Sequence, residues 1–300
     1  MMTDFDKIFG SYVAAINSAA EKCTLKDAFS GRESEGLDAM LDAMAYSLNN
    51  GGKRIRPVLT LEFCRLCGGD YESAIPFALG VEMIHTYSLI HDDLPCMDND
   101  DMRRGKPSSH KVYGEANALL AGDGLLTLAF ETVLSAELSA DKKVKAALEL
   151  AKAAGVSGMI GGQVMDLANE GKDVSLDAIR ATDRLKTGEM IRVAAVMGCI
   201  AAGADEVKIK AADEYCANIG LAFQIVDDIL DVTSDDATLG KPVGSDSENE
   251  KSTYVSHLGI EESIRYAREL TANAKAAIEI FGGEGEFLSE LADKLSERKS

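Results

Sequence analysis

Apolar residues recur with the period of an α-helix along almost the whole chain, and no convincing run alternates with the period of two that a half-buried strand requires. The composition agrees, because only five prolines and no tryptophan occur among the 300 residues. No Pro- or Ser-rich linker divides the chain, so we predict an all-α fold with a single domain over residues 1–300. The expected helices cover residues 4–23, 36–48, 55–67, 71–94, 115–137, 141–168, 175–201, 206–232, 261–280 and 286–298.

The formal charge of −19, from 31 basic and 50 acidic residues, argues against a nucleic-acid backbone or an anionic membrane as a general partner. The first residues, Met-Met-Thr-Asp-Phe-Asp, carry acid where a signal peptide needs basic side chains. The most apolar long stretch, Met190 to Ala204, contains Arg192 and is too short to span a bilayer. We therefore expect a cytoplasmic protein with no nucleic-acid partner and no stable membrane insertion.

Two clusters of aspartate each follow an apolar, helix-like run: Asp92-Asp93-Leu-Pro-Cys-Met-Asp98 and Asp227-Asp228-Ile-Leu-Asp231. In the second cluster the first and last carboxylates fall about 40° apart on one helix face, where like charges destabilise a helix unless a cation is present. Carboxylate oxygens without His or Cys suit Mg²⁺, which binds through one or two carboxylates together with substrate phosphates. The two clusters therefore predict a cation-mediated clamp for a phosphorylated substrate.

The segments that follow the two clusters differ. Pro95 is expected to end the first helix, so that Asp98 reaches back from an extended continuation. The second cluster is followed by the longest irregular stretch, residues 233–253, which is rich in Ser, Asp and Gly. Loops of this length are usually functional lids or disordered segments, and we expect a lid that closes over the site.

Two basic segments stand out in this acidic chain. Gly51-Gly52-Lys53-Arg54-Ile55-Arg56-Pro57 places a glycine turn and three cations at the start of a helix, where free N–H groups suit a phosphate. Arg103-Arg104-Gly105-Lys106 follows the first acidic cluster, and Arg suits bidentate recognition of a diphosphate. A solvated basic turn and mutual neutralisation at the surface are the simpler alternatives for these segments.

Further residues could line such a site. His85 lies two helical turns before Asp92, although a structural role is the commoner one for a lone helical His. Gly188 is expected to weaken or kink the helix at Lys186-Thr187-Gly188, and Gln224 lies three residues before Asp227. No Gly-x-Ser-x-Gly elbow, dinucleotide fingerprint or Cys/His nucleophile pair occurs.

The six cysteines include a lone Cys-x-x-Cys pair, Cys64 and Cys67, without a second ligand pair nearby. Structural zinc sites normally take four Cys or His ligands, so zinc is disfavoured. Buried, reduced thiols are the expected state of these residues.

Taken together, these segments resemble the trans-prenyl diphosphate synthases, and most closely the bacterial farnesyl diphosphate synthases. The resemblance covers almost the whole chain and includes Gly51–Pro57, His85–Asp98, Gly161-Gly162-Gln163, Lys186-Thr187-Gly188, Gln224–Asp231 and Lys241–Asp246. It implies an isoprenoid-synthase-type helical bundle around a deep central cavity, usually a homodimer, with three Mg²⁺ ions. The implied reaction condenses isopentenyl diphosphate with dimethylallyl and geranyl diphosphate to give (E,E)-farnesyl diphosphate.

The resemblance also implies roles for individual residues. The metal ions would be bound by Asp92, Asp93, Asp98, Asp227, Asp228 and Asp231. The allylic diphosphate would be held by metal with Arg103, Lys186 and Lys241, and isopentenyl diphosphate by Lys53, Arg56, His85 and Arg104. The expected catalytic set is Lys186, Thr187 and Gln224, of which the last two would flank the reacting carbons.

Chain length is the finer question. Tyr87, with Ser88 beside it, lies five residues before Asp92, about 7.5 Å along a helix toward the cavity floor. In the resembling family an aromatic residue here accompanies a C15 product, whereas a purely structural role in the core is the simpler alternative. A geranylgeranyl diphosphate synthase, a class I terpene cyclase and a non-catalytic regulatory subunit remain open. The second acidic motif argues against a cyclase, and retention of both motifs argues against a regulatory subunit.

Overall fold

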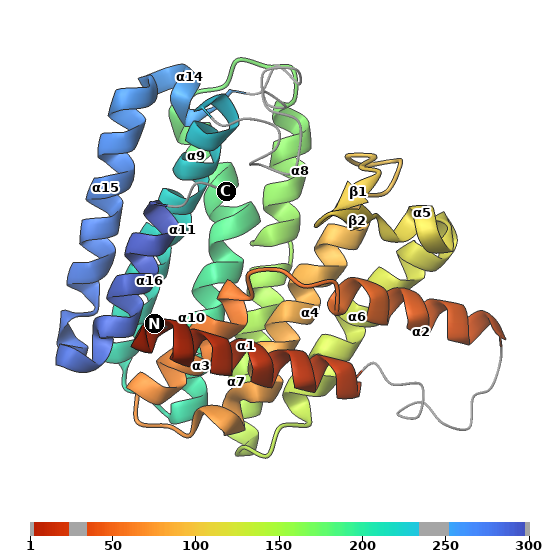
Figure 1. Cartoon of the computed structure of the whole chain (residues 1–300), viewed down its shortest axis with the longest axis horizontal. Helices are drawn as coiled ribbons and strands as arrows, with labels where there is room; N and C mark the ends of the chain where they lie inside the picture. Colours follow the sequence, from red (N-terminus) through yellow and green to blue (C-terminus); the bar gives the residue numbers. More distant parts are fainter. Residues whose placement is uncertain (1–2, 24–34, 234–251, 298–300) are drawn as a thin grey trace.

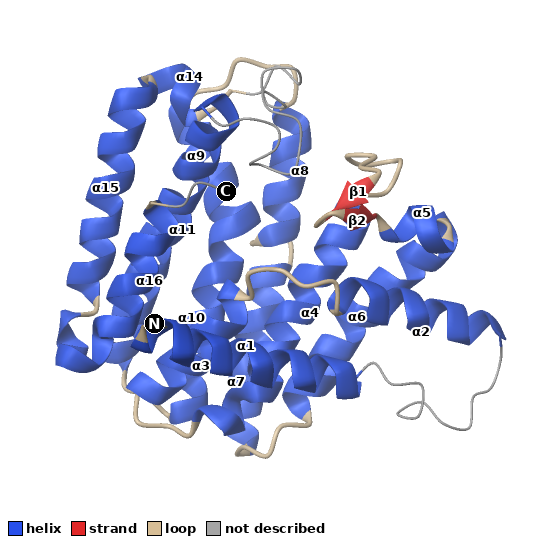
Figure 2. Ribbon diagram, in the orientation of Figure 1, coloured by secondary structure: helices blue, strands red, loops and turns tan. Residues whose placement is uncertain are grey.

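The computed structural model describes residues 3–23, 35–233 and 252–297 and consists mainly of α-helices (Figures 1 and 2). The longer helices are α1 (Asp4–Cys23), α2 (Glu35–Leu48), α3 (Ile55–Leu66), α4 (Ile75–Asp92), α6 (Glu115–Leu134), α7 (Ala140–Ala154), α8 (Met159–Asn169), α9 (Leu176–Asp183), α10 (Glu189–Ala202), α11 (Glu206–Thr233), α15 (Ile260–Ala277) and α16 (Glu286–Ser296). Shorter elements are α5 (Ser109–Tyr113), α14 (Tyr254–Leu258), the 3₁₀ turns η2 (Tyr71–Ala74) and η4 (Glu279–Gly285), and the π-helical turn η3 (Arg184–Gly188). The all-α prediction is confirmed.

One long helix expected over residues 141–168 is two helices in the structure. The chain leaves α7 at Gly155 and enters α8 after Gly158. A Cβ atom on Gly158 would lie 2.1 Å from the Ala153 carbonyl oxygen, so the turn between the helices requires glycine there. The apolar period continues across the break, which is why periodicity alone did not reveal it.

A small hairpin is the one pair of strands in the described residues, and the sequence pattern did not predict it. β1 (Met102–Arg103) pairs antiparallel with β2 (Lys106–Pro107). Arg104 and Gly105 at its tip have φ angles of 53° and 74°. Positive φ at both central residues is the geometry of a type I′ turn, which matches the twist of the paired strands. Figure 2 shows this hairpin beside α5.

Helix α4 lies at the centre of the main core. Helices α3, α6 and α10 surround it, and its side chains are buried almost all round, as expected of an interior helix (Figure 1). The main hydrophobic cluster also includes residues of α1, α2, α7 and α16. A smaller cluster lies between α9, α11, α14 and α15, and α11 contributes to both clusters.

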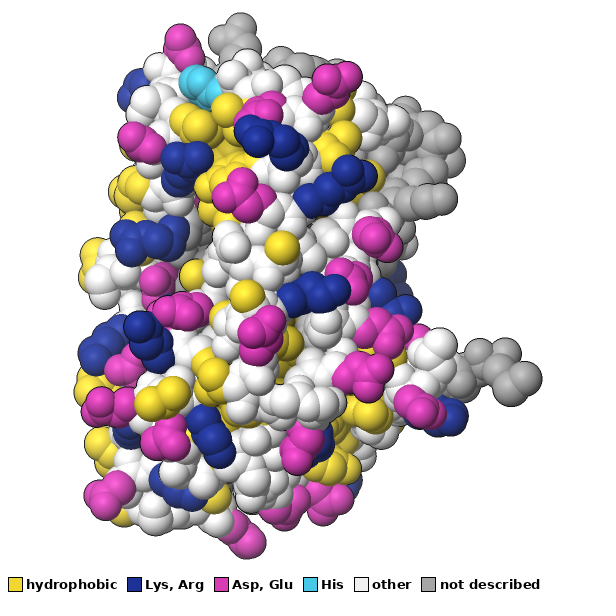
Figure 3. Space-filling model, turned by 90° about the vertical axis from the view of Figure 1, so that its left-hand side faces the viewer, with side chains coloured by type: hydrophobic (Ala, Val, Ile, Leu, Met, Phe, Trp, Pro, Cys, Tyr) yellow, Lys and Arg dark blue, Asp and Glu magenta, His cyan; other side chains and the backbone are white. Residues whose placement is uncertain are grey.

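Length and composition would allow α6 to cross a membrane, the one such helix in the described parts of the chain. A core helix meets the same criteria, and α6 packs its buried side against α4. At the opposite side of the molecule, the face with α15 carries hydrophobic, basic and acidic side chains intermixed (Figure 3).

Candidate active site

A tight turn after α4 brings Asp98 back to Asp92. The helix ends at Asp92, ahead of Pro95, as predicted. The Asp98 backbone N–H then donates to the Asp92 carbonyl oxygen at 2.9 Å. The extended continuation predicted for this segment is therefore wrong, because such a hydrogen bond closes a turn. The result is that both carboxylates stand at the same end of α4.

Asp93, between them in the sequence, pairs with the arginine at the end of β1. Its side chain is 2 % exposed, and Arg103 donates from Nε to Asp93 Oδ1 at 2.8 Å and from a second guanidinium N–H to the same oxygen. The same guanidinium reaches Asp100 Oδ2 at 3.0 Å. Burial raises the pKa of Asp93, and the Arg103 hydrogen bonds oppose that rise. This carboxylate therefore fixes the position of the Arg103 side chain, which lines the cavity described below.

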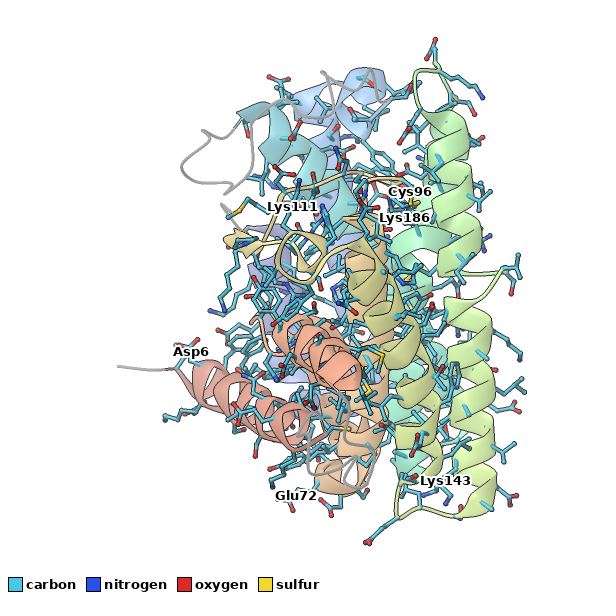
Figure 4. All side chains as sticks on the ribbon, turned by 90° about the vertical axis from the view of Figure 1, so that its right-hand side faces the viewer. Asp6, Glu72, Cys96, Lys111, Lys143 and Lys186 are labelled. Atoms are coloured by element: carbon cyan, nitrogen blue, oxygen red, sulfur yellow. The ribbon has the colours of Figure 1, made fainter. Side chains whose placement is uncertain are left out.

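Lys186 stands opposite the first acidic cluster. Its Nζ donates to Asp166 Oδ2 at 2.6 Å, and it also attracts Asp92 and Asp98 electrostatically. Burial opposes charging of the ammonium, but pairing with Asp166 raises the pKa of Lys186. Figure 4 labels Lys186 and also Cys96, which lies in the turn between Asp92 and Asp98.

The same surroundings make Asp92 reluctant to ionise. Burial raises the pKa of Asp92 to about 6, Lys186 lowers it, and the charge on Asp98 raises it. A crowded carboxylate whose charged form is disfavoured gains when a cation arrives. Asp92 is therefore a carboxylate that a bound cation would stabilise, as the sequence predicts for the acidic clusters.

The backbone around Lys186 is a π-helical turn, η3, between α9 and α10. Gly162 on α8 packs directly against it, since a Cβ atom there would lie 2.2 Å from the Lys186 backbone nitrogen. Glycine therefore allows the close approach that places Asp166, one turn further along α8, within reach of the ammonium. The helix is irregular at Lys186-Thr187-Gly188, where the sequence indicated a weak point, and single π turns are frequent at functional sites. Thr187 is half-buried in this turn.

The second acidic cluster occupies the last turns of α11. Asp227 and Asp228 are half-buried, and Asp228 Oδ2 accepts the backbone N–H of Tyr254, at the start of α14, at 2.8 Å. Asp231 is 2 % exposed and does not line the cavity described next. The three aspartates therefore face different surroundings although they share one helix end.

A cavity of about 400 Å³ joins α11 to η3, α8 and α9. Five residues predicted to form the site line it, namely Arg103, Lys186, Gln224, Asp227 and Asp228. The fold thus brings two aspartates of the second acidic cluster to one cavity with Gln224, Lys186 and Arg103, and the first acidic cluster contacts this cavity through the last two. It adds Asp166, Asn169, Thr182 and Asp183, which the sequence reasoning missed. The only sequence signal for Asp166 is its position three residues after Gly161-Gly162-Gln163.

A second basic cluster lies at the starts of α3 and the hairpin. Arg56 is half-buried, and its buried Nε has no hydrogen-bond partner among the described residues. Burial and the nearby Arg56 and Arg104 hold the pKa of His85 well below its usual range. A neutral His beside two arginines, one with an unused buried donor, forms a ready anion-binding group. Lys53 is exposed at its edge.

Arg54, between the two predicted cations in the sequence, has a structural role. It is 3 % exposed and donates to Glu82 Oε1 at 2.6 Å, to the Leu48 carbonyl at 2.7 Å and to Asn17 Oδ1 at 3.1 Å. Glu82, which the sequence reasoning also missed, lies one turn before His85 on α4 and provides the buried negative charge beneath this basic cluster.

The hairpin turn sends consecutive arginines to different places. Arg103 points to Asp93 and the cavity, whereas Arg104 donates to the Gly51 carbonyl at 2.6 Å. A Cβ atom on Gly52 would lie 2.6 Å from the Arg104 guanidinium carbon, so that glycine admits the side chain. The positive φ of Arg104 is unusual for a non-glycine residue and is typical of functional sites. The two basic groups predicted from the sequence are therefore distinct in the structure.

Tyr87 is buried on α4, 5 % exposed, with its ring packed edge-on against His91 at a centroid distance of 5.6 Å. Its hydroxyl is buried and has no hydrogen-bond partner in the described residues. Burial and the charge of Asp92 together raise the pKa of Tyr87 to about 12, which places the ring near the first acidic cluster. Ser88 beside it donates to the His85 carbonyl at 2.9 Å.

The donor set suits Mg²⁺ in chemical type, because Asp92, Asp98 and Asp227 supply only oxygen. Within residues 3–23, 35–233 and 252–297, however, no group of three or more acidic, His or Cys side chains stands close enough to hold a metal ion. Mg²⁺ keeps substrate phosphates and waters among its six ligands, so a few carboxylates on each side are sufficient. Lys241 and most of the 233–253 segment lie outside the described residues.

These helices, with acidic ends at a polar cavity, define an all-α isoprenoid synthase. Two solved structures share the fold. An FPP/GFPP synthase from Zymomonas mobilis has a TM-score of 0.84 and 33 % sequence identity, and the match covers 96 % of this chain and 97 % of that one. A putative farnesyl-diphosphate synthase from Marinomonas sp. MED121 has a TM-score of 0.82 and 32 % sequence identity, and the match covers 99 % of this chain and 100 % of that one. The chain belongs to the polyprenyl synthetase family, whose model matches residues 38–280.

Relatives in this family differ in their product. A geranylgeranyl diphosphate synthase from Cyanophora paradoxa is 46 % identical over 86 % of this chain and 87 % of its own length. A farnesyl diphosphate synthase from Geobacillus stearothermophilus is 45 % identical over 86 % and 89 %. The chain is therefore a prenyltransferase of isoprenoid biosynthesis that uses isoprenyl diphosphates, and the length of its product is a separate question.

Proposed function

We propose that this enzyme extends dimethylallyl and geranyl diphosphate with isopentenyl diphosphate and releases (E,E)-farnesyl diphosphate. The observation that supports a C15 product is the buried ring of Tyr87, packed on His91 and near Asp92 at the end of α4. An aromatic ring held in the core cannot move aside cheaply, because protein interiors are close-packed. A growing chain that passes along α4 would stop against it.

Mg²⁺ would be held by Asp92 and Asp98 on one side of the cavity and by Asp227 on the other, and it would neutralise the diphosphate so that the allylic C–O bond can ionise. Asp93 acts through Arg103, and Asp228 through the start of α14, because both carboxylates already have these partners. Asp231, buried on α11, supports the helix end and has no direct contact with the cavity.

The allylic diphosphate would occupy the 400 Å³ cavity, where Lys186 and Arg103 are oriented by Asp166 and Asp93. The lid expected from the sequence, residues 233–253 with Lys241, lies largely outside the described residues. Isopentenyl diphosphate would bind at Lys53, Arg56, His85 and Arg104, where the buried Arg56 Nε supplies an unused donor. Two diphosphates held by two basic groups place the acceptor double bond beside the ionising carbon.

The residues between the two groups then guide the reaction. Thr187 and Gln224 present a hydroxyl and an amide oxygen whose dipoles stabilise the positive charge as the allylic bond breaks. The isopentenyl double bond attacks the cation, and a proton is lost to the released pyrophosphate. The apolar wall of α4 and α6 excludes water, which would otherwise trap the cation as an alcohol.

A geranylgeranyl product is the second candidate, because relatives that make it are as similar to this chain as those that make farnesyl diphosphate. Incubation of the purified protein with Mg²⁺, dimethylallyl diphosphate and isopentenyl diphosphate, followed by chromatography of the products, separates the two. Farnesyl diphosphate as the main product supports the proposal. Geranylgeranyl diphosphate would refute it, as would a cyclic product or no turnover.

We propose further that a single-domain chain assembles as a homodimer in the cytoplasm. Helix α6 exposes three apolar side chains, those of Leu119, Leu120 and Leu134. A contact between two copies of the chain would bury such side chains. Light scattering gives the mass directly. A monomer at micromolar concentration would contradict the dimer.

A further inference from the structure

Cys67 and Cys199 bring two thiols together at the far ends of α3 and α10. Their sulfur atoms lie 3.7 Å apart although the residues are 132 positions apart in sequence. Cys199 is fully buried, whereas Cys67, in the residue that caps α3, is half-buried and accessible from the surface. Prenyl transfer as derived above uses neither thiol. Both thiols are reduced, as expected, and the sequence did not reveal that they lie in contact.

The two helices carry these thiols in a close, parallel packing. Thr60 Oγ1 on α3 donates to the Ala194 carbonyl of α10 at 2.8 Å. One turn on, a Cβ atom on Gly198 would lie 2.2 Å from the Thr60 carbonyl oxygen, and beyond the thiols a Cβ on Gly69 would lie 2.9 Å from Ala202 Cα. Glycines on both sides of the pair thus allow the two backbones to pack closely, and the two sulfur atoms lie in contact between them.

The surroundings distinguish the two sulfurs. Their mutual hydrogen bond lowers the pKa of the Cys67 thiol against the effect of burial, and Lys208 lowers it further. The same contact raises the pKa of Cys199, as does its burial. Cys67 can meet an oxidant from the surface, and the buried Cys199 sulfur lies within reach of it, which is the arrangement of an attacking and a resolving cysteine.

We propose that Cys67 and Cys199 form an oxidisable dithiol, which a hydroperoxide converts into a disulfide that joins α3 to α10. Cys67 loses its proton and its thiolate attacks the peroxide; the O–O bond breaks, Cys67 sulfenic acid forms, and the leaving oxygen takes up the proton to give water or an alcohol. Cys199 then loses its proton and attacks the Cys67 sulfur; the S–S bond forms, the S–O bond breaks, and water leaves. Two thiols are oxidised and one peroxide is reduced.

The parallel packing determines what the bond does. Arg56 lies at the opposite end of α3, and Lys186 lies at the opposite end of α10, so the cross-link ties the helix pair far from both groups that hold diphosphate. The disulfide therefore restrains α3 against α10 and does not move the side chains that contact the substrates. We expect a higher thermal midpoint, with turnover changed less than about twofold.

The test treats the full-length protein with a small excess of hydrogen peroxide, blocks the remaining thiols and maps linked peptides by mass spectrometry without reductant. A Cys67–Cys199 linkage that dithiothreitol reverses is expected, together with a thermal midpoint that falls on reduction. Cys67→Ser should remove the linkage and the effect of reductant on the midpoint. Cys23→Ser is the matched control, because Cys23 is also half-buried but faces the Thr132 hydroxyl and no second thiol.

Three results would overturn the proposal. The first is a Cys64–Cys67 linkage, which would make the neighbouring Cys-x-x-Cys the reactive pair. The second is Cys67 oxidised to sulfinic acid without any cross-link. The third is an effect of reductant on the thermal midpoint that survives Cys67→Ser, or a Cys67–Cys199 linkage that is lost in the Cys23→Ser control. Because the wild-type protein alone yields the map, poor folding of a variant does not remove the test.

Discussion

The Lys186 ammonium lies 2.6 Å from the Asp166 carboxylate, which joins the π-helical turn η3 to α8 at the wall of the cavity. Asp166→Asn removes the negative charge that orients and charges Lys186. We expect kcat/KM for the allylic diphosphate to fall about 10- to 100-fold, since a misplaced clamp weakens positioning of the reacting bond. Steady-state kinetics with each substrate varied in turn give the measurement, and KM for isopentenyl diphosphate should change little.

The matched control is the pair between Lys275 and Asp293, whose Nζ and Oδ2 lie 2.7 Å apart on α15 and α16. Asp293→Asn breaks a similar pair far from the cavity and should leave kcat/KM unchanged. Equal losses in both variants would mean that Asp166 acts through general stability.

Gly162→Ala should damage both the fold and the site. The added Cβ would lie 2.2 Å from the Lys186 backbone nitrogen, so α8 or η3 must move. Overpacking of this kind costs about 1–3 kcal/mol of unfolding free energy, and we expect turnover to fall at least tenfold with it. Gly10→Ala on α1 is the control, because nothing lies within 4 Å of its added Cβ. Denaturant unfolding and steady-state kinetics of both variants give the measurement. If Gly162→Ala changes neither the free energy of unfolding nor turnover, the close approach is not required.

Asp92 should make stability of the metal-free enzyme depend on pH. Its pKa of about 6 in the fold lies above the ordinary 3.8, so the folded state binds this proton more tightly than the unfolded chain. The Asp92 carboxylate therefore does not lower the free energy of unfolding below pH 4. It lowers it increasingly between pH 4 and 6, and by its full amount above pH 6.

Asp92→Asn should then stabilise the metal-free protein by about 1 to 2 kcal/mol at pH 8, allowing for partial exposure, and by nothing near pH 4. Urea unfolding in the presence of a chelator at both pH values gives the comparison. The same variant should lose most of its turnover. A stabilisation that is equal at the two pH values would contradict the assignment of this proton to Asp92.

Glu82→Gln should destabilise the fold strongly. The side chains of Glu82 and Arg54 are nearly fully buried, and their ion pair is 2.6 Å long, so the substitution leaves a buried positive charge without its carboxylate. Removal of one partner from a buried pair typically costs about 3–5 kcal/mol. Glu262→Gln breaks the exposed Arg265–Glu262 pair on α15 and should have no measurable effect. Thermal unfolding of the two variants side by side is sufficient, and equal midpoints would sink the prediction.

Tyr87→Ala should lengthen the product. Removal of the buried ring opens space beside His91, so chain growth continues and the main product shifts from C15 toward C20. Tyr87→Phe keeps the ring and removes only a hydroxyl without a partner, so it should retain the wild-type product. Chromatography of the products of all three proteins shows the outcome. An unchanged distribution for Tyr87→Ala would mean that the ring is only part of the core.

Most of the helices could be read from the sequence, because a period of 3.6 residues is a local property of each segment. The ends of α1, α3 and α11 agree with the expected ranges within one residue. The break between α7 and α8 could not be predicted from the sequence, and neither could the β1–β2 hairpin. Each depends on the backbone conformation of one or two residues, which the apolar periodicity does not report. The turn after Pro95 was mistaken for an extended segment for the same reason.

The sequence by itself also determined the kind of chemistry: two oxygen-rich clusters, two basic segments and no nucleophile are visible in the order of residues alone. Only the tertiary structure decided which charges pair. Asp93 positions Arg103, Asp166 positions Lys186, and Glu82 balances Arg54. These contacts join residues 10, 20 and 28 positions apart through turns and helix packing, and no local pattern encodes them. Which of two neighbouring charges reaches the cavity is therefore a property of the packing.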